Sequence, residues 1–280
     1  MSGALLVVGT PIGNLEDLSP RAARALAECD AVLAEDTRRA RQLLAHLGVE
    51  KKELVRHDAH ATEADHQRAL ARLLAGETLA LVTDAGTPGV SDPGASLVAR
   101  AASAGVRVSP IPGASAVVAA VAASGFGRAS FRFVGFLPRD GSARDDALSR
   151  AAADPDVVVF FESPRRVAGT LAELARLCPT REAMVARELT KLHEELVRGS
   201  VAELAADPRE WLGELTIALG PWEAPVSDDV DAATIDRWLG EQLALGATVR
   251  EAARVIAARS GWPKREVYAR AVGLAARREG

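Results

Sequence analysis

Short apolar runs alternate with helical patterns along most of the chain, and this alternation constrains the fold more than any other feature. The runs that predict buried strands in the first half lie at residues 4–8, 30–34, 54–55, 78–82 and 106–111. The helical patterns open at Ser19-Pro20, a cap residue before a proline, and recur at residues 38–47, 62–75, 96–104 and 115–124. Continuous apolar strands separated by helices are typical of a mainly parallel sheet covered on both faces.

A second series of strands and helices follows the first. Its apolar runs lie at residues 131–136, 157–161, 183–186 and 215–219, with a helix after Pro164. The polar segment 138–146 predicts a loop. The sequence therefore predicts an α/β fold of two αβ domains, at residues 1–118 and 119–224, with the change between them near residues 114–125.

The last part of the chain has a different pattern. Residues 220–229 hold two prolines and several acidic residues, which is typical of a linker. Amphipathic helices are predicted at residues 232–245, 249–258 and 264–277, with a Ser-Gly-Trp-Pro break at residues 260–263. A helix, a short glycine-containing turn and another helix form a helix-turn-helix pattern. We predict that residues 225–280 are a linker and a small helical segment.

Net charge is unevenly distributed along the chain. The 280 residues carry a formal charge of −4 with a pI near 5.8, which taken alone argues against a nucleic-acid binder. Residues 250–280, however, carry a net charge of +5, against −9 for residues 1–249. The eight basic residues of that segment are Arg250, Arg254, Arg259, Lys264, Arg265, Arg270, Arg277 and Arg278. The overall charge therefore does not exclude an RNA partner, and it indicates which segment would bind one.

Other classes are excluded by simple counts. Cys29 and Cys178 are too few for a disulfide framework and lack Cys-x-x-Cys metal spacing. His57 and His60 have no carboxylate or cysteine partner at metal-ligand spacing. No stretch approaches the ~20 apolar residues of a membrane helix, and the first residues read as a strand rather than a signal peptide. We expect a soluble, cytoplasmic protein with no metal site and no membrane partner.

Three loops rich in glycine, proline and small hydroxyl residues follow predicted strands, at residues 9–14, 83–94 and 110–116. Ligands of open α/β sheets bind outside the carboxyl ends of the strands, where glycines let the backbone approach closely. One such loop alone would be a tight turn, but three at one edge predict a small-molecule site. The loops lack the phosphate-binding and dinucleotide motifs and are nearly free of Lys and Arg. A ligand with an adenosine-like part and a cationic or zwitterionic end fits them.

Several longer motifs carry a resemblance to a known family. They lie at residues 9–15, 34–38, 81–94, 112–116, 161–166 and 188–191. With them the chain resembles the ribosomal RNA small subunit methyltransferase I family over nearly its whole length. This family comprises S-adenosylmethionine-dependent cytidine 2′-O-methyltransferases of the tetrapyrrole methylase superfamily. The tetrapyrrole branch has a Gly-Pro-Gly-Asp type first loop, whereas Asn14 stands here in place of that Asp, which favours the rRNA branch.

The resemblance implies two αβ domains of the tetrapyrrole methylase type, a cleft between them for S-adenosylmethionine, and a homodimer. It implies a substrate cytidine in the decoding centre of 16S rRNA, presented by the 30S small ribosomal subunit. The residues it assigns to the cofactor are Pro11, Asp84, Ala85, Gly86, Ser115, Ala116, Phe161, Thr216, Ile217 and Ala218. Residues 215–219 could equally be an ordinary core strand.

Methyl transfer to a ribose hydroxyl needs the methyl donor and the hydroxyl to be held in line. It also needs a base that takes the hydroxyl proton, or a positive neighbour that stabilises the developing negative charge on the oxygen. Glu35, Asp36 and Arg38 lie at the end of a predicted strand and are the candidates for this role. Adjacent strand residues face opposite ways, so we expect one carboxylate to enter the cleft, and Asp36 could instead cap the following helix. Lys191 is a further candidate, for positioning substrate or stabilising charge, although it could simply be an exposed lysine.

Two questions stay open at the level of sequence. Arg165 and Arg166 could contact RNA phosphate or lie on a solvated helix turn. A tetrapyrrole-precursor methyltransferase with the same cofactor is the alternative enzyme, and a DNA reader using the terminal helices is the alternative binding protein. The DNA reader would leave the first 220 residues without a role.

Overall fold

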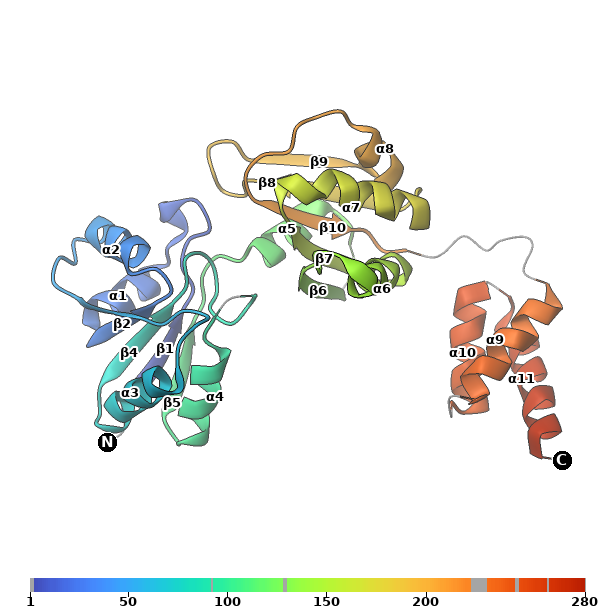
Figure 1. Ribbon diagram of the computed structural model, residues 1–280, viewed down its shortest axis with the longest axis horizontal. Coiled ribbons are helices and arrows are strands. Elements are labelled where there is room, and N and C mark those ends of the chain that lie inside the picture. The colour runs from blue at the N-terminus through green and yellow to red at the C-terminus, as the bar shows by residue number, and fades with distance from the viewer. Residues whose placement is uncertain are drawn as a thin grey trace. The chain divides into compact units, whose positions relative to one another are not determined.

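The computed structural model describes residues 3–91, 93–127, 130–222, 231–244, 247–260 and 262–279. It divides into two compact units, residues 1–221 and residues 222–280. The first unit contains two five-stranded sheets, and the second contains helices (Figure 1).

The first sheet is parallel throughout, as the sequence predicts. Its strands are β1 (Ala4–Val8), β2 (Ala31–Ala34), β3 (Glu53–Arg56), β4 (Thr78–Val82) and β5 (Arg107–Ile111). They are arranged in the order β3-β2-β4-β1-β5, and every neighbouring pair is parallel. The carboxyl ends of all five strands therefore meet at one edge of the sheet.

Helices cover both faces of this sheet (Figure 1). Helices α1 (Pro20–Glu28) and α2 (Thr37–His46) lie on one face, and α3 (Glu63–Leu74) and α4 (Ala95–Ser103) lie on the other. Successive strand side chains point to opposite faces, so both faces of a strand that is buried on both sides must be apolar. In β2, for example, Val32 packs under α1 and α2 whereas Leu33 packs under α3 and α4.

The second sheet is mixed rather than mainly parallel. Its strands are β6 (Phe131–Phe136), β7 (Val157–Glu162), β8 (Glu182–Arg187), β9 (Glu195–Ser200) and β10 (Leu215–Leu219), in the order β6-β7-β10-β8-β9. Only β6 and β7 pair in parallel; the other three pairings are antiparallel. Strand β9 and the short helix α8 (Val201–Ala206) carry no strong apolar periodicity, and the sequence analysis did not predict them.

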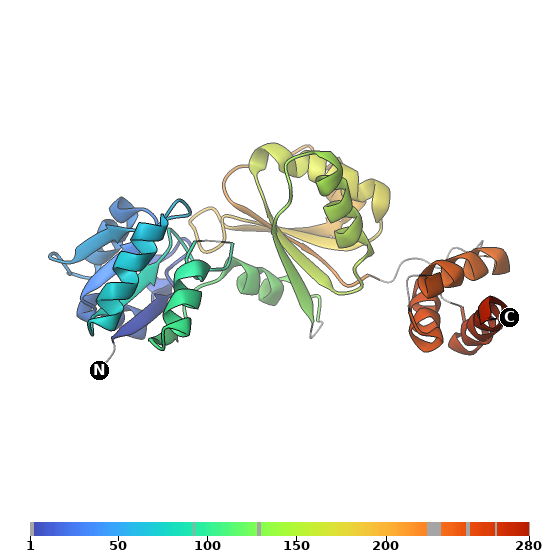
Figure 2. The same ribbon diagram turned by 60° about the horizontal axis from the view of Figure 1, so that its bottom comes forward.

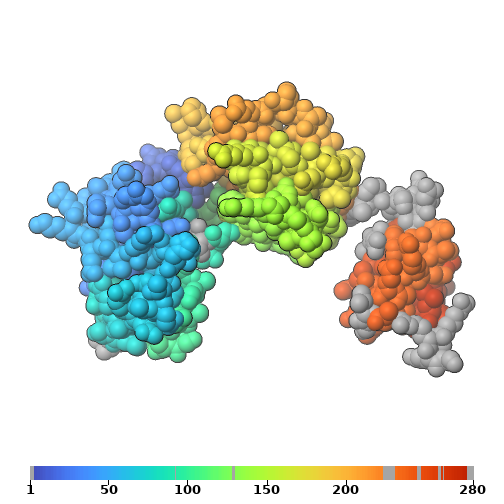
Figure 3. All heavy atoms as spheres, viewed as in Figure 1, coloured from blue at the N-terminus to red at the C-terminus, as the bar shows by residue number. Residues whose placement is uncertain are grey.

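The predicted loop at residues 138–146 is wrong from Gly141 onward, because helix α6 (Gly141–Ala153) begins there. Tertiary contacts stabilise the polar start of this helix. The side chain of Arg144 is buried and donates to Thr170 Oγ1 at 2.9 Å and to Glu173 Oε2 at 3.2 Å, both on α7 (Pro164–Leu177). Helices α6 and α7 lie side by side, and in the space-filling view they cover one face of the second sheet (Figure 3).

Helix α5 (Ala116–Ser124) lies on the opposite face of the second sheet (Figure 2). Its buried residues Val117 and Ala120 share one core with Val159 of β7 and Ala218 of β10. The chain therefore passes from the first sheet to the second ahead of α5.

The second unit consists of α9 (Ala232–Ala244), α10 (Val249–Ser260) and α11 (Lys264–Glu279). The three helices enclose a core of their own, formed by Ile235, Leu239, Ala252, Ala253, Ile256, Ala257, Val267 and Ala271. The predicted linker falls largely on residues 223–230, which lie outside the described part of the chain. Among the described helices of both units, none is long and apolar enough to cross a membrane.

Arg181 is the largest fully buried side chain among the described residues, and its hydrogen bonds connect three segments around the second sheet. Its guanidinium donates to the carbonyl oxygens of Gly220 and Ala151 at 2.7 Å and of Asp156 at 2.8 Å. Burial lowers the pKa of this guanidinium. The carbonyl groups at the end of α6, before β7 and after β10 are thus satisfied by one side chain.

We expect Arg181→Met to lower the free energy of unfolding by about 3 kcal/mol, because it leaves several buried carbonyl groups without donors. Urea denaturation followed by circular dichroism measures this loss. Arg176→Met is the matched control, since Arg176 is exposed on α7. Equal stability of the two variants would contradict the structural role of Arg181.

Candidate functional site

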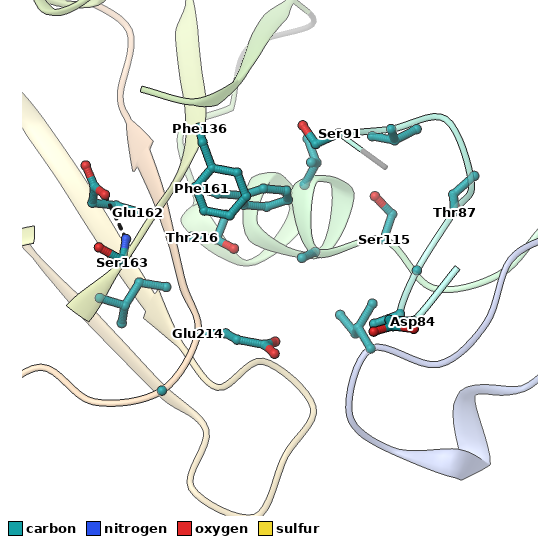
Figure 4. Close-up of a pocket in the computed structure, with 18 of the residues that line it drawn as sticks. Asp84, Thr87, Ser91, Ser115, Phe136, Phe161, Glu162, Ser163, Glu214 and Thr216 are labelled. Atoms are coloured by element: carbon teal, nitrogen blue, oxygen red, sulfur yellow. Dashed lines mark hydrogen bonds between the residues drawn. The ribbon is translucent and has the colours of Figure 1, made fainter. Parts of the chain in front are cut away.

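A pocket of about 430 Å³ lies between the carboxyl edge of the first sheet and the second sheet (Figure 4). This volume falls in the range that binds small molecules and cofactors. Its lining combines loops of the first sheet with side chains of β6, β7 and β10. The lining residues are Ile12, Glu35, Arg39, Asp84, Ala85, Gly86, Thr87, Val90, Ser91, Ser115, Ala116, Val117, Phe136, Phe161, Glu162, Ser163, Pro164, Gly213, Glu214, Leu215 and Thr216.

Backbone forms much of the wall on the side of the first sheet. Gly86 has a positive φ of +80°, which glycine adopts without strain, and it pairs with Thr10 through backbone hydrogen bonds of 2.8 and 3.2 Å. Gly9 and Gly113 press their backbones together so closely that a Cβ on Gly9 would lie 2.7 Å from the nitrogen of Gly113. The first and third Gly/Pro loops are therefore in direct contact at the edge of the pocket.

Aromatic rings form the opposite wall. Phe161 of β7 lies beside Phe136 of β6, with ring centroids 5.4 Å apart, and Figure 4 shows both rings next to Thr216. The alternation of strand side chains decides which residues of β10 reach the pocket. Thr216 lines it, Ile217 points away and is fully buried, and Ala218 lies in the core under α5.

The structure brings seven of the ten predicted cofactor residues to this pocket: Asp84, Ala85, Gly86, Ser115, Ala116, Phe161 and Thr216. Ile217 and Ala218 lie in the buried interior of β10. Pro11 lines a neighbouring pocket on the first sheet instead. Those three residues have no side-chain atoms in the main pocket's lining.

Glu35 is the member of the predicted catalytic set that lines the pocket. Its Oε2 accepts a hydrogen bond from the backbone N–H of Asp84 at 3.3 Å. The carboxylate of Asp84 in turn accepts from the N–H of Asp36 at 3.1 Å and lies 3.5 Å from Arg39 Nε. Two carboxylates and one guanidinium thus meet at the carboxyl ends of β2 and β4.

Asp36 and Arg38 are engaged with each other outside the lining of the pocket. Asp36 caps α2 by accepting from the N–H of Arg38 at 2.8 Å, and it forms an ion pair with the Arg38 guanidinium at 2.6 Å. The hydrogen bonds from Arg38 hold the pKa of Asp36 well below its ordinary value. A carboxylate with such a low pKa is a weak proton acceptor.

Lys191 also lies outside the lining but contacts a residue within it. Its Nζ lies 2.9 Å from Glu188 Oε1 and 3.1 Å from Oε2 of Glu214, which lines the pocket. Although burial opposes it, hydrogen bonding to these two glutamates raises the pKa of Lys191, which therefore stays protonated at neutral pH. The loop is strained, with positive φ angles at Glu188 and Thr190.

The strained loop at residues 188–191 also contacts the loop that follows β1. Thr190 Oγ1 accepts from the N–H of Asn14 at 3.1 Å, and Lys191 packs against Gly13. The two loops meet beside Ile12 and Glu214, which line the pocket.

The motif at residues 161–166 divides between the pocket and the core. Glu162 is buried, and it accepts from the N–H of Ser163 at 2.7 Å and from Thr170 Oγ1 at 2.9 Å. Arg166 pairs with it at 2.6 Å and donates to the carbonyl oxygen of Leu137 at 3.1 Å. Arg166 is thus a core ion pair, whereas Arg165 is exposed.

Sequence reasoning missed several groups of the site. Arg39, Phe136 and Glu214 line the pocket, but each lies outside or at the margin of the recognisable motifs. Arg39 directly follows the motif at residues 34–38, and this position is the only sequence signal for it. No local signal marks Phe136 or Glu214, because only the pairing of β6 and β10 with β7 brings them to the pocket.

His57, for which the sequence predicts no metal-ligand role, lies in the interior of the first sheet's layer. His57 is buried and its Nε2 has no hydrogen-bond partner in the described part of the chain, and burial lowers its pKa. Within those same residues no group of three or more His, Cys, Asp or Glu side chains is arranged to hold a metal ion.

Solved structures share the architecture of the first unit. A uroporphyrin-III C-methyltransferase from Thermus thermophilus matches 78% of this chain and 97% of its own length, with a TM-score of 0.57 and 24% identity. Diphthine synthase matches 78% of this chain and 90% of its own, with a TM-score of 0.61 and 15% identity. Another structure of the Thermus enzyme, with a TM-score of 0.54, is complexed with S-adenosylhomocysteine. The fold is that of a tetrapyrrole-type methylase.

Sequence comparisons narrow the class. Residues 4–205 match the tetrapyrrole (corrin/porphyrin) methylase family, and residues 229–275 match the RsmI C-terminal HTH domain. Proteins named ribosomal RNA small subunit methyltransferase I are 42% identical in Xylella fastidiosa and 40% identical in Halalkalibacterium halodurans, each over 95% of this chain and over 98% and 93% of their own lengths. The Thermotoga maritima protein of that name is 43% identical over 219 residues, 78% of this chain and 98% of its own. The chain belongs to the family of ribosomal RNA small subunit methyltransferase I.

Proposed function

We propose that the protein methylates the ribose 2′-hydroxyl of a cytidine in 16S rRNA, with S-adenosylmethionine as the methyl donor. The family assignment supports methylation of small-subunit rRNA. The observation that carries the chemistry is the pocket between the two sheets, with Glu35 at its edge and no basic side chain other than Arg39 in its lining.

The pocket's residues fit this cofactor. An adenosyl group is flat and largely apolar on its faces, and Phe136, Phe161 and Val90 offer matching surface. Backbone groups at Ala85 and Ser115, which line the pocket, supply donors and acceptors at close approach. The sulfonium and ammonium groups of the cofactor are cationic, and the carboxylates of Glu35, Asp84 and Glu214 complement them.

The bound cofactor supplies an electrophilic methyl group on a sulfonium. The ribose 2′-oxygen forms the new C–O bond while the C–S bond breaks and sulfur leaves as a neutral thioether. Glu35 takes the hydroxyl proton in this proposal, since it is the carboxylate of the predicted set that lines the pocket. Holding the two reactants in line contributes about 7–11 kcal/mol to the acceleration. Asp36 and Arg38 shape the turn that presents Glu35, and Lys191 positions Glu214.

We assign RNA binding to the second unit. A groove of about 560 Å³ lies next to Tyr268, which is half exposed, and one of its lining residues is acidic, Glu251. Its four basic lining residues are Arg250 and Arg254 of α10 and Lys264 and Arg265 of α11. Arg270, in contrast, is paired with Asp236 at 2.8 Å. Cations beside an exposed aromatic ring match a nucleic-acid backbone and its unstacked bases. The family resemblance further supports a cytoplasmic homodimer that acts on 16S rRNA or the 30S subunit.

The direct test is transfer of labelled methyl from S-adenosylmethionine to unmodified 30S subunits and to naked 16S rRNA, followed by digestion to nucleosides. We expect labelled 2′-O-methylcytidine from at least one of the two substrates. Label in a different nucleoside, or in neither RNA, would refute the assignment.

We expect Glu35→Gln to lower kcat by about 10²-fold or more, because the amide cannot accept the proton. Asp36→Asn should stay within about threefold of the wild type, since Asn caps a helix as well as Asp. Single-turnover rates at saturating cofactor measure both effects. A large loss in Asp36→Asn with an active Glu35→Gln would reverse the two roles.

We expect the double variant Arg254→Ala/Lys264→Ala to raise KM for RNA and to reduce the salt dependence of RNA binding by a slope of about 2, because two phosphate contacts are lost. The kcat at saturating RNA should not change. The control is Arg176→Ala/Arg237→Ala, which removes two exposed arginines outside the groove. Equal salt slopes in the two variants would exclude the groove as the RNA contact.

A further inference from the structure

A second pocket, of about 360 Å³, adjoins the cofactor pocket on the first sheet. It is formed by the loop after β1, by helix α2 and by the end of β4. Its lining residues are Thr10, Pro11, Leu15, Arg39, Ala40, Gln42, Leu43, Val82, Thr83 and Asp84. Arg39 and Asp84 line both pockets, so the two cavities share part of their walls.

The walls of the second pocket have the chemistry of a site for one flat heterocycle. Pro11, Leu15 and Leu43 offer apolar surface, and Leu15 leaves 44% of its surface exposed although it is a large apolar residue. The volume lies near the lower end of the range for small-molecule pockets, which suits a single nucleoside.

One polar side chain in these walls is available to a ligand. Gln42 is exposed on α2, and its amide has no hydrogen-bond partner among the residues that the structure describes. An amide both donates and accepts, as does the edge of cytosine, with its exocyclic amino donor and its ring acceptors.

We propose that this second pocket binds the base of the target cytidine, so that the ribose lies at the partition made by Arg39 and Asp84. The inference rests on the proposed function and names the acceptor subsite of that reaction. The target nucleotide leaves its stacked neighbours to enter the pocket, as unstacked bases do in sequence-specific RNA recognition. Gln42 reads the base edge, and Arg39 is the cation nearest to the nucleotide's phosphate.

Geometry favours this placement over a site elsewhere on the first unit. In-line transfer requires the acceptor oxygen within about 3–3.5 Å of the donor methyl. A nucleoside seated in a cavity that shares Arg39 and Asp84 with the cofactor pocket has its ribose next to that pocket. Glu35, which lines the cofactor pocket and bonds to the backbone of Asp84, lies on the same wall.

The test compares Gln42→Glu and Arg39→Ala with Arg41→Ala, an exposed arginine on the same helix outside both pockets. Two quantities are measured on the full chain: KM for RNA in methyl transfer, and the affinity for cytidine 5′-monophosphate in the presence of S-adenosylhomocysteine. We expect Gln42→Glu and Arg39→Ala each to raise KM for RNA at least tenfold and to weaken nucleotide binding. Arg41→Ala should match the wild type.

S-adenosylhomocysteine binding distinguishes a local effect from misfolding, and it should change less than twofold in Gln42→Glu. Binding of cytidine 5′-monophosphate that is equal in Gln42→Glu and Arg41→Ala, with an equal KM for RNA, would overturn the inference while leaving the proposed function intact. An enzyme that binds cytidine 5′-monophosphate in a Gln42-dependent way but methylates no cytidine would uphold the pocket's ligand and refute the proposed reaction.

Discussion

The parallel direction of the first sheet is the constraint on which the rest of the site depends. Because β1, β4 and β5 run the same way, their three Gly/Pro loops emerge at one edge. Had one strand been reversed, its loop would lie at the opposite end of the sheet, about 17 Å away for a five-residue strand. The contact between Gly9 and Gly113 and the pairing of Thr10 with Gly86 then lock the three loops into one surface.

A buried ion pair positions the wall of the pocket that the second sheet forms. Glu162 is buried at the end of β7, where an unpaired carboxylate would be strongly destabilising. Arg166 neutralises it and also binds the carbonyl oxygens of Leu137 and Pro138, which follow β6. One ion pair therefore ties the chain after β6 to the start of α7, and this connection keeps Phe136 beside Phe161 at the pocket.

Charge is unevenly distributed within the second unit. Residues 250–280 carry a net charge of +5 and residues 222–249 a net charge of −5, so the positive charge of this unit is concentrated in the segment that contains α10 and α11. The Thermotoga relative matches 219 residues of this chain over 98% of its own length, close to the length of the first unit alone. The greater length of this chain therefore corresponds to its second, helical unit.

Continuous apolar strands, capping residues and Gly/Pro motifs are local signals. The parallel first sheet, the C-terminal helices and the three Gly/Pro loops could therefore be predicted from the sequence alone. The motifs behind the family resemblance singled out Glu35, Asp84 and Ser115, and the structure brings all three to one pocket. The strand directions of the second sheet, the helix at residues 141–153 and the partners of Lys191 were decided by tertiary structure. Phe136 and Glu214 reach the pocket only through strand pairing between distant segments. Arg144 favours a helix only because α7 supplies its hydrogen-bond acceptors.

Glu35 and Asp36 are neighbouring carboxylates that look equivalent in the sequence, but the tertiary structure gives them different surroundings. The backbone turn at the end of β2 directs Glu35 into the pocket and Asp36 onto the start of α2.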